Sequence, residues 1–89
     1  MKVFTSSFGK IELTDERLSH ILEFHPEVEA LQKYFATALK NPDLIRPSKS
    51  DRQVHIFYRK ITNIKFLAIV TKINSRKFIL TAYITNKLI

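Results

Sequence analysis

The chain contains no cysteine and no tryptophan, and only one of its 89 residues, Gly9, is a glycine. The lack of cysteine excludes disulfides, thiolate metal sites and a cysteine nucleophile. It also fits a reducing compartment, so we expect a cytoplasmic protein. One glycine and three prolines argue against a low-complexity or disordered chain. The length predicts a single domain over residues 1–89.

Long apolar runs and the common catalytic motifs are also missing. The longest apolar run, residues 66–70, is far too short to span a membrane, and the first residues lack the apolar segment of a signal peptide. We therefore expect no membrane partner. There is no glycine-rich phosphate loop, no serine-nucleophile motif and no carboxylate pair at a recognisable catalytic spacing, so ATPase, hydrolase-fold and glycosidase functions are not indicated.

Acidic residues are absent after Asp51. All eight Asp and Glu lie between Glu12 and Asp51, whereas residues 52–89 carry eight Lys or Arg and contribute more than the whole net charge of +7. A positive field of this kind attracts polyanions and raises their encounter rate. Nucleic acid is the polyanion that a small basic protein meets most often, so RNA is the predicted partner.

Two amphipathic helices are predicted in the first half of the chain. Thr14 is a good N-cap for a helix that runs to about Phe24, because Pro26 disfavours the α conformation in the residue before it. Pro26 suits the first turn of a second helix, which Asn41-Pro42 ends.

Strand patterns dominate the second half. Residues 54–59 alternate, residues 65–72 are apolar on both faces as in an interior strand, and residues 78–85 alternate again. In the last strand, the alternation places Ile79 on the same face as Thr81, Tyr83 and Thr85. The short connections between these three strands predict an antiparallel meander.

Three shorter segments are also β-prone. Residues 3–8 and 10–13, around Gly9, form a small hairpin or one edge strand, and residues 44–45 form a short strand. The predicted fold is α+β, with two N-terminal amphipathic helices packed on a mainly antiparallel sheet of about four strands.

Two histidines lie on the first predicted helix. His20 and His25 are five residues apart, so they point about 140° from each other and do not have the spacing of a helical metal pair. We predict no metal site and no cofactor. If the two histidines have only structural roles, His25 is a helix-end residue at the edge of the core and His20 is a solvated residue. Functionally, the helix dipole favours a protonated His25 as a general acid, and a second histidine can serve as base.

Thr81, Tyr83 and Thr85 form a polar stripe on the last predicted strand. Such a stripe is either the solvent face of an edge strand or a surface that stacks bases and positions phosphates. Arg59 and Lys72 each end a strand and are the cations best placed to hold phosphate charge.

Several segments together resemble a known group of small nucleases. They are the run from Leu13 to Glu27 (LTDERLSHILEFHPE), the NPDLI segment at 41–45, Ser50-Asp51, Tyr58, the strand at 65–72 and the TAYIT segment at 81–85. This combination resembles the barnase–EndoU–colicin–RelE (BECR) nuclease superfamily, in particular its small phage and bacterial domains, over residues 13–87.

The resemblance implies two helices with an antiparallel sheet, and metal-independent RNA cleavage, often in toxins. It also implies that the family's helix histidines correspond to His20 and His25, and its last-strand hydroxyls to Thr81 and Tyr83. One departure is Phe24, where many members carry an arginine before the second histidine.

We therefore expect a metal-independent endoribonuclease, a toxin or phage-derived effector that cleaves RNA by 2′-OH attack. Its predicted catalytic residues are His20, His25, Thr81 and Tyr83. Its predicted substrate-binding residues are Arg59, Lys60, Lys72, Tyr58 and Thr85.

Two other functions stay open. One is a non-catalytic RNA-binding module on the same fold, with Tyr83, Tyr58 and Phe57 stacking bases. The other is an interaction domain whose basic face binds an acidic protein such as an antitoxin or immunity protein.

Overall fold

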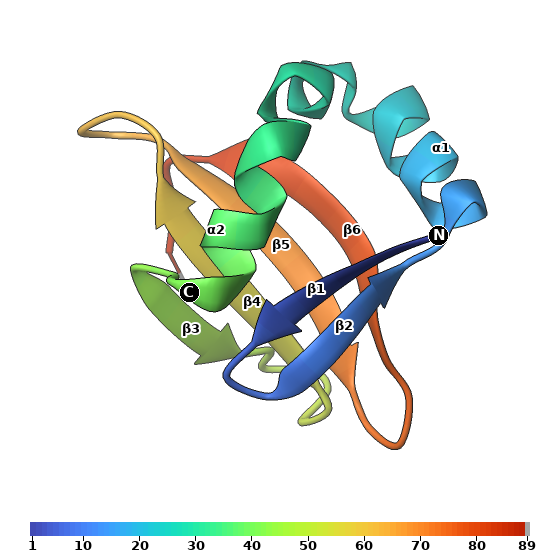
Figure 1. Ribbon diagram of the computed structural model, residues 1–89. Coiled ribbons are helices and arrows are strands. Elements are labelled where there is room, and N and C mark those ends of the chain that lie inside the picture. The colour runs from blue at the N-terminus through green and yellow to red at the C-terminus, as the bar shows by residue number, and fades with distance from the viewer. Residues whose placement is uncertain (89) are drawn as a thin grey trace.

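The computed structural model describes residues 1–88, which form one six-stranded sheet and three helical segments (Figure 1). The strands are β1 (Lys2–Ser6), β2 (Gly9–Leu13), β3 (Leu44–Pro47), β4 (Val54–Lys60), β5 (Phe66–Ile73) and β6 (Lys77–Thr85). The helical segments are α1 (Asp15–Phe24), the 3₁₀ helix η1 (Pro26–Tyr34) and α2 (Phe35–Lys40). Over this part of the chain no helix combines the length and hydropathy needed to cross a membrane.

The sheet is larger and more mixed than the sequence predicted. Its strand order is β1-β2-β6-β5-β4-β3, and every pair is antiparallel except β2 and β6, which run parallel at Glu12 and Phe78. The α+β class is correct, but the prediction of about four strands behind two N-terminal helices is wrong, because the β1–β2 hairpin precedes the helices and joins the sheet. The β2–β6 pairing links positions 66 residues apart (78 minus 12), so no local pattern encodes it.

Helix α1 begins and ends where the sequence predicted. The Thr14 hydroxyl accepts a hydrogen bond from the backbone N–H of Arg17 at 3.1 Å, and the helix ends before His25. The second predicted helix is only partly correct, because η1 is 3₁₀ and only the last six residues before Asn41 are α-helical. Val28 and Leu31 are three residues apart, so a three-residue turn places both against the core.

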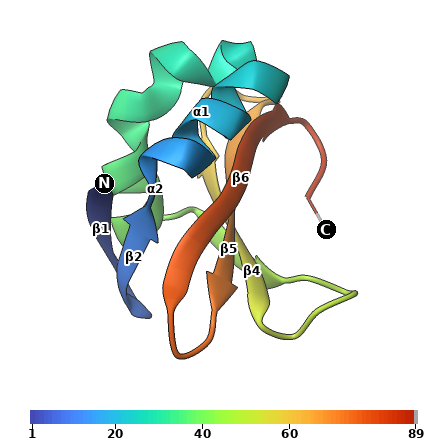
Figure 2. The same cartoon turned by 90° about the vertical axis from the view of Figure 1, so that its right-hand side faces the viewer.

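The helices cover one face of the sheet, as Figure 2 shows. We call this the covered face, and we call the other the open face. Along β4, Phe57 packs into the covered-face core while Ile56 and Tyr58 pack on the open face, so the predicted alternation is confirmed. Interior strand β5 likewise contributes Leu67 to the covered face and Ala68 to the open face.

A β-bulge in β6 overturns one detail of the predicted alternation. Val70 of β5 faces Thr81, but the next residue, Thr71, faces Ile79, which leaves Leu80 as an extra residue. The extra residue reverses the alternation, so Ile79 packs in the covered-face core. The hydroxyl residues of β6 stay on the open face.

Candidate functional site

The end of α1 meets the C-terminal half of β6 at the edge of the open face. Strand β2 ends at Leu13 and pairs with β6 only near Phe78, so α1, rather than a strand, lies along the rest of that edge (Figure 2). Pro26 stops the helix at His25, whose backbone N–H donates to the carbonyl of Ile21 at 2.7 Å. The His25 ring then packs against the Tyr83 ring, with centroids 5.9 Å apart and planes inclined by 39°.

This contact brings together two of the four predicted catalytic residues. Thr81 lies two positions before Tyr83 on the same strand face, opposite Val70 of β5. We call His25, Thr81 and Tyr83 the helix–strand corner. All three side chains are partly exposed, so a ligand on the open face can reach them.

The Tyr83 phenol is a hydrogen-bond donor at neutral pH. Burial raises its pKa above the ordinary value of 10.0, and the nearby Tyr58 adds to the shift. Thr85, further along β6, is engaged locally: its hydroxyl accepts from the N–H of Lys87 at 3.0 Å and donates to the carbonyl of Lys87 at 3.3 Å. Thr85 therefore fixes the chain after the strand.

Glu27 is a neighbour of His25 that the sequence analysis did not assign to the site. Its Oε2 lies 3.6 Å from Nδ1 of His25, which forms an ion pair when the imidazole is protonated. The sequence places Glu27 two residues after His25 across the Pro26 break, a spacing that becomes a contact because the chain turns there.

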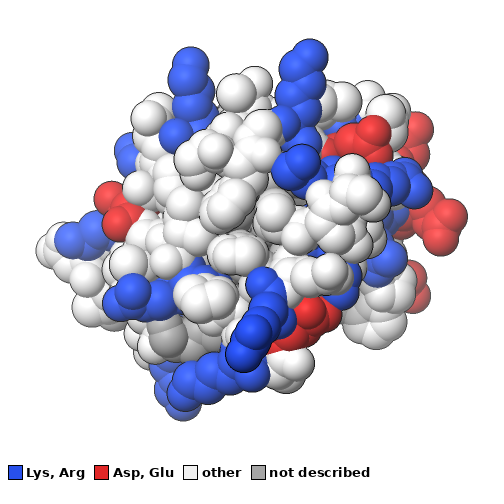
Figure 3. All heavy atoms as spheres, turned by 90° about the horizontal axis from the view of Figure 1, so that it is seen from below, with Lys and Arg blue, Asp and Glu red and all other residues white. Residues whose placement is uncertain are grey.

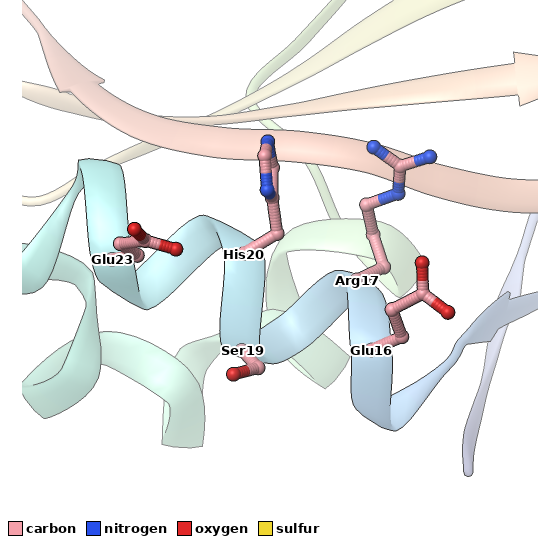
Figure 4. A pocket seen from close by; sticks show the side chains of 5 residues that line it. All are labelled: Glu16, Arg17, Ser19, His20 and Glu23. Atoms are coloured by element: carbon pink, nitrogen blue, oxygen red, sulfur yellow. The ribbon is translucent and has the colours of Figure 1, made fainter.

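His20 has different surroundings. Its ring packs on Phe24 at 4.8 Å, and it lines a groove of about 410 Å³ along the exposed side of α1 with Glu16, Arg17, Ser19 and Glu23. In Figure 4, His20 and Arg17 point to the same side of the helix, and Ser19 points to the other. With two carboxylates and one guanidinium, this groove carries a net negative charge when His20 is neutral, which disfavours phosphate.

The predicted phosphate-binding cations do not gather at the helix–strand corner. Arg59 lies on the covered side of β4, where its Nη1 donates to the carbonyl of Asn41 at 2.8 Å and closes the end of α2. Lys72 faces the open side but is four residues along β5 from Ala68, the partner of Tyr83, or about 13 Å at the usual rise per residue.

Lys72 is also neutralised by an acid. Its Nζ bonds Oδ2 of Asp51 at 2.6 Å. The hydrogen bond from Lys72, followed by the one from the backbone N–H of Gln53, lowers the pKa of Asp51 from 3.8. Lys60 is exposed at the end of β4, where its backbone N–H donates to Asp43.

The aromatic residues of β4 are not available for base stacking. Tyr58 is 1% exposed and packs edge-on to Phe66, and Phe57 is fully buried on the covered side. Tyr58 belongs instead to the buried open-face cluster against which Tyr83 packs. On the open face, Tyr83 is the predicted aromatic residue that retains an exposed surface.

The basic side chains do not form one continuous patch at the end of the molecule shown in Figure 3. Lys and Arg stand apart around an uncharged middle, with Asp and Glu among them. Two acids of the first half account for part of this: Asp51 pairs with Lys72, and Glu12 pairs with Arg76 at 3.1 Å. Over residues 1–88, no three His, Asp or Glu side chains cluster closely enough to hold a metal ion.

Comparison of the chain with protein-family models, with curated proteins and with solved structures finds no match. The functional argument therefore depends on the geometry of the site.

Proposed function

We propose that this protein is a metal-independent endoribonuclease whose reaction takes place at the helix–strand corner. The observation that carries the proposal is the contact of the His25 ring with the Tyr83 ring at the accessible edge of the open face. It joins an imidazole, a group used for proton transfer, to a hydrogen-bond donor on a surface that a single RNA strand can reach.

The reaction transfers two protons. A base removes the 2′-OH proton, the 2′ oxygen attacks the adjacent phosphorus, and an acid protonates the departing 5′ oxygen. The products are a 2′,3′-cyclic phosphate and a 5′-hydroxyl end. Both proton transfers are within the range of imidazole chemistry.

His25 suits the acid. It caps the C-terminal end of α1, where the helix dipole stabilises a positive charge, and Glu27 lies 3.6 Å from Nδ1. A general acid at this position is the imidazolium form of the side chain, which has a proton to give. The neutral Tyr83 phenol donates a hydrogen bond to a phosphate oxygen as negative charge develops there. His20, which the sequence predicted as the second catalytic histidine, lies outside the corner in the negatively charged groove, so the corner itself supplies the acid and not the base.

The decisive experiment incubates the pure protein with single-stranded RNA in EDTA and analyses the product ends. We expect 2′,3′-cyclic phosphate ends, and a rate loss of about 10²- to 10⁴-fold for His25→Ala. Lys10→Gln, an exposed change on the distant strand β2, is the matched control and should cleave normally. Circular dichroism confirms that each variant folds. Absence of cleavage by the wild-type protein, or full activity of His25→Ala, contradicts the proposal.

A non-catalytic RNA-binding module is the second candidate. It is favoured by the engagement of Arg59 with Asn41 and of Lys72 with Asp51, which holds these two predicted phosphate-binding cations away from the corner. This candidate predicts RNA affinity that falls with salt while the strand stays intact. Filter binding at several salt concentrations, with the RNA checked for breaks, separates the two.

The proposal includes a cytoplasmic location, where RNA substrates are present, and an acidic inhibitor protein that binds the basic surface. The charge of +7 supports such a partner. Purification of the protein with the products of neighbouring genes tests this point, and the absence of any acidic binder contradicts it.

A further inference from the structure

A second hollow lies on the covered side of the sheet, lined by residues from the start of α2, the end of β4 and the start of β5. It has a volume of about 290 Å³. Its lining residues are Tyr34, Thr37, Arg59, Lys60, Ile61 and Leu67. Arg59 and Lys60, which the sequence assigned to the RNA site, thus share a different site from Tyr83.

The lining combines three kinds of group. Leu67 supplies an apolar floor and Tyr34 an aromatic ring that is 45% exposed. Thr37 supplies a hydroxyl. Arg59 supplies a positive charge on the covered side, and Lys60, the exposed last residue of β4, supplies a second.

Arg59 is held in place before any ligand arrives. Its Nη1 donates to the carbonyl of Asn41 at 2.8 Å, which fixes the side chain across the end of α2. A guanidinium has five N–H donors, so four are left after this bond. A fixed guanidinium loses little conformational entropy when it binds a planar or tetrahedral oxyanion.

We propose that this hollow binds a nucleoside monophosphate unit, with the base against Tyr34 and the phosphate on Arg59 and Lys60. An exposed aromatic ring stacks on any base. A phosphate monoester carries a charge of about −1.5 to −2 at pH 7, which two cations match better than one. An internal phosphodiester, with a single charge, needs only one of them, so the terminal nucleotide of an RNA fits better than its interior.

The negative charge of Asp43 partly offsets the positive charge of the hollow. Its Oδ2 accepts the backbone N–H of Lys60 at 2.7 Å, so a carboxylate lies beside the backbone of one lining residue. Asn in its place keeps an acceptor for that N–H and removes the negative charge, so Asp43→Asn should tighten phosphate binding.

The test titrates the full-length protein with adenosine 5′-monophosphate and follows amide signals by NMR. We expect saturable shifts at Tyr34, Thr37 and Ile61. Tyr34→Ala removes the ring that stacks on the base, so it should weaken binding roughly tenfold. Lys60→Gln removes an exposed charge, so it should weaken binding about threefold. Lys10→Gln should bind as the wild type does.

Three results overturn the proposal: no saturable shifts around Tyr34, equal binding of adenosine and its monophosphate, or tighter binding of an acidic peptide than of the nucleotide. The inference does not depend on catalysis at the helix–strand corner. His25→Ala should bind the nucleotide normally, so an inactive protein that still binds it contradicts only the proposed function. A protein that cleaves RNA without binding the nucleotide contradicts only this inference.

Discussion

The two faces of the sheet differ in how much of the fold depends on them. Within residues 1–88, twelve buried residues form the covered-face core, whereas the buried cluster on the open face contains three: Ile56, Tyr58 and Ala68. The hydroxyl residues of β6 and the His25 ring lie at the open face. Stability therefore depends mainly on the covered face, and the open face has fewer residues that the fold requires.

Truncation of the covered face should have the largest effect. Phe57 is fully buried there, so Phe57→Ala removes a whole ring and leaves a cavity. We expect the free energy of unfolding to fall by about 3–5 kcal/mol. Urea denaturation followed by circular dichroism measures it. Phe24→Ala is the control, because Phe24 is 63% exposed and its loss should change stability by less than about 0.5 kcal/mol. Equal losses of unfolding free energy in the two variants would contradict the expected difference between a buried and an exposed aromatic residue.

A substitution on the open face should change the rate of RNA cleavage rather than the stability of the protein. Tyr83→Phe keeps the ring that packs on His25 and removes only the hydroxyl. We expect unfolding to change by less than about 0.5 kcal/mol, and RNA cleavage to slow roughly tenfold through loss of one hydrogen bond. Cleavage kinetics and urea denaturation of the same preparation check both values. A large loss of stability with normal cleavage would reverse the comparison.

The smallest effect should come from releasing Lys72 at the far end of the open face. Asp51→Asn removes the carboxylate that bonds Lys72. If Lys72 then contacts a phosphate, the slope of log affinity for single-stranded RNA against log salt should steepen by about 0.7. Binding measured from low to moderate salt gives the slope. An unchanged slope would mean that Lys72 does not reach the RNA.

The same variant has a predictable pH dependence. The Lys72 hydrogen bond, with help from the Gln53 N–H, lowers the pKa of Asp51 in the folded state below 3.8. A lowered carboxyl pKa contributes stability above its unfolded value, and that contribution is lost as pH falls through the folded value. The melting temperature of the wild type should therefore fall more steeply below about pH 4 than that of Asp51→Asn. Parallel curves for the two proteins would show that the ion pair does not contribute to stability.

The features that the sequence predicted correctly are local ones. Thr14 caps α1, Pro26 ends it after Phe24, and the alternation of β4 divides the two cores, because each of these features depends on neighbouring residues only. The position of the β1–β2 hairpin beside β6 could not be predicted, since it depends on contacts between distant parts of the chain. The Leu80 bulge depends on the register with β5, which a single strand does not encode.

The candidate site also combines features that the sequence predicted with features that depend on the fold. That His25 and Tyr83 belong to one set was a prediction from the sequence, and their ring contact follows from the packing of α1 along β6. Arg59 and Lys72 lie away from this pair in the fold. Their partners, Asn41 and Asp51, lie 18 and 21 positions away and are determined by strand pairing. Exposed charge can be counted from a sequence, but the acid that neutralises each cation depends on the fold.

The parallel pairing of β2 with β6 affects the order in which the chain folds. Strands β4, β5 and β6 pair with their neighbours in sequence, so this meander can form early from short loops. Closing the 66-residue loop between Glu12 and Phe78 costs about 4 kcal/mol of chain entropy before any contact is gained. The hairpin should therefore dock last. During that interval β6 has an unpaired edge, where a second chain can add its own strand before the hairpin arrives.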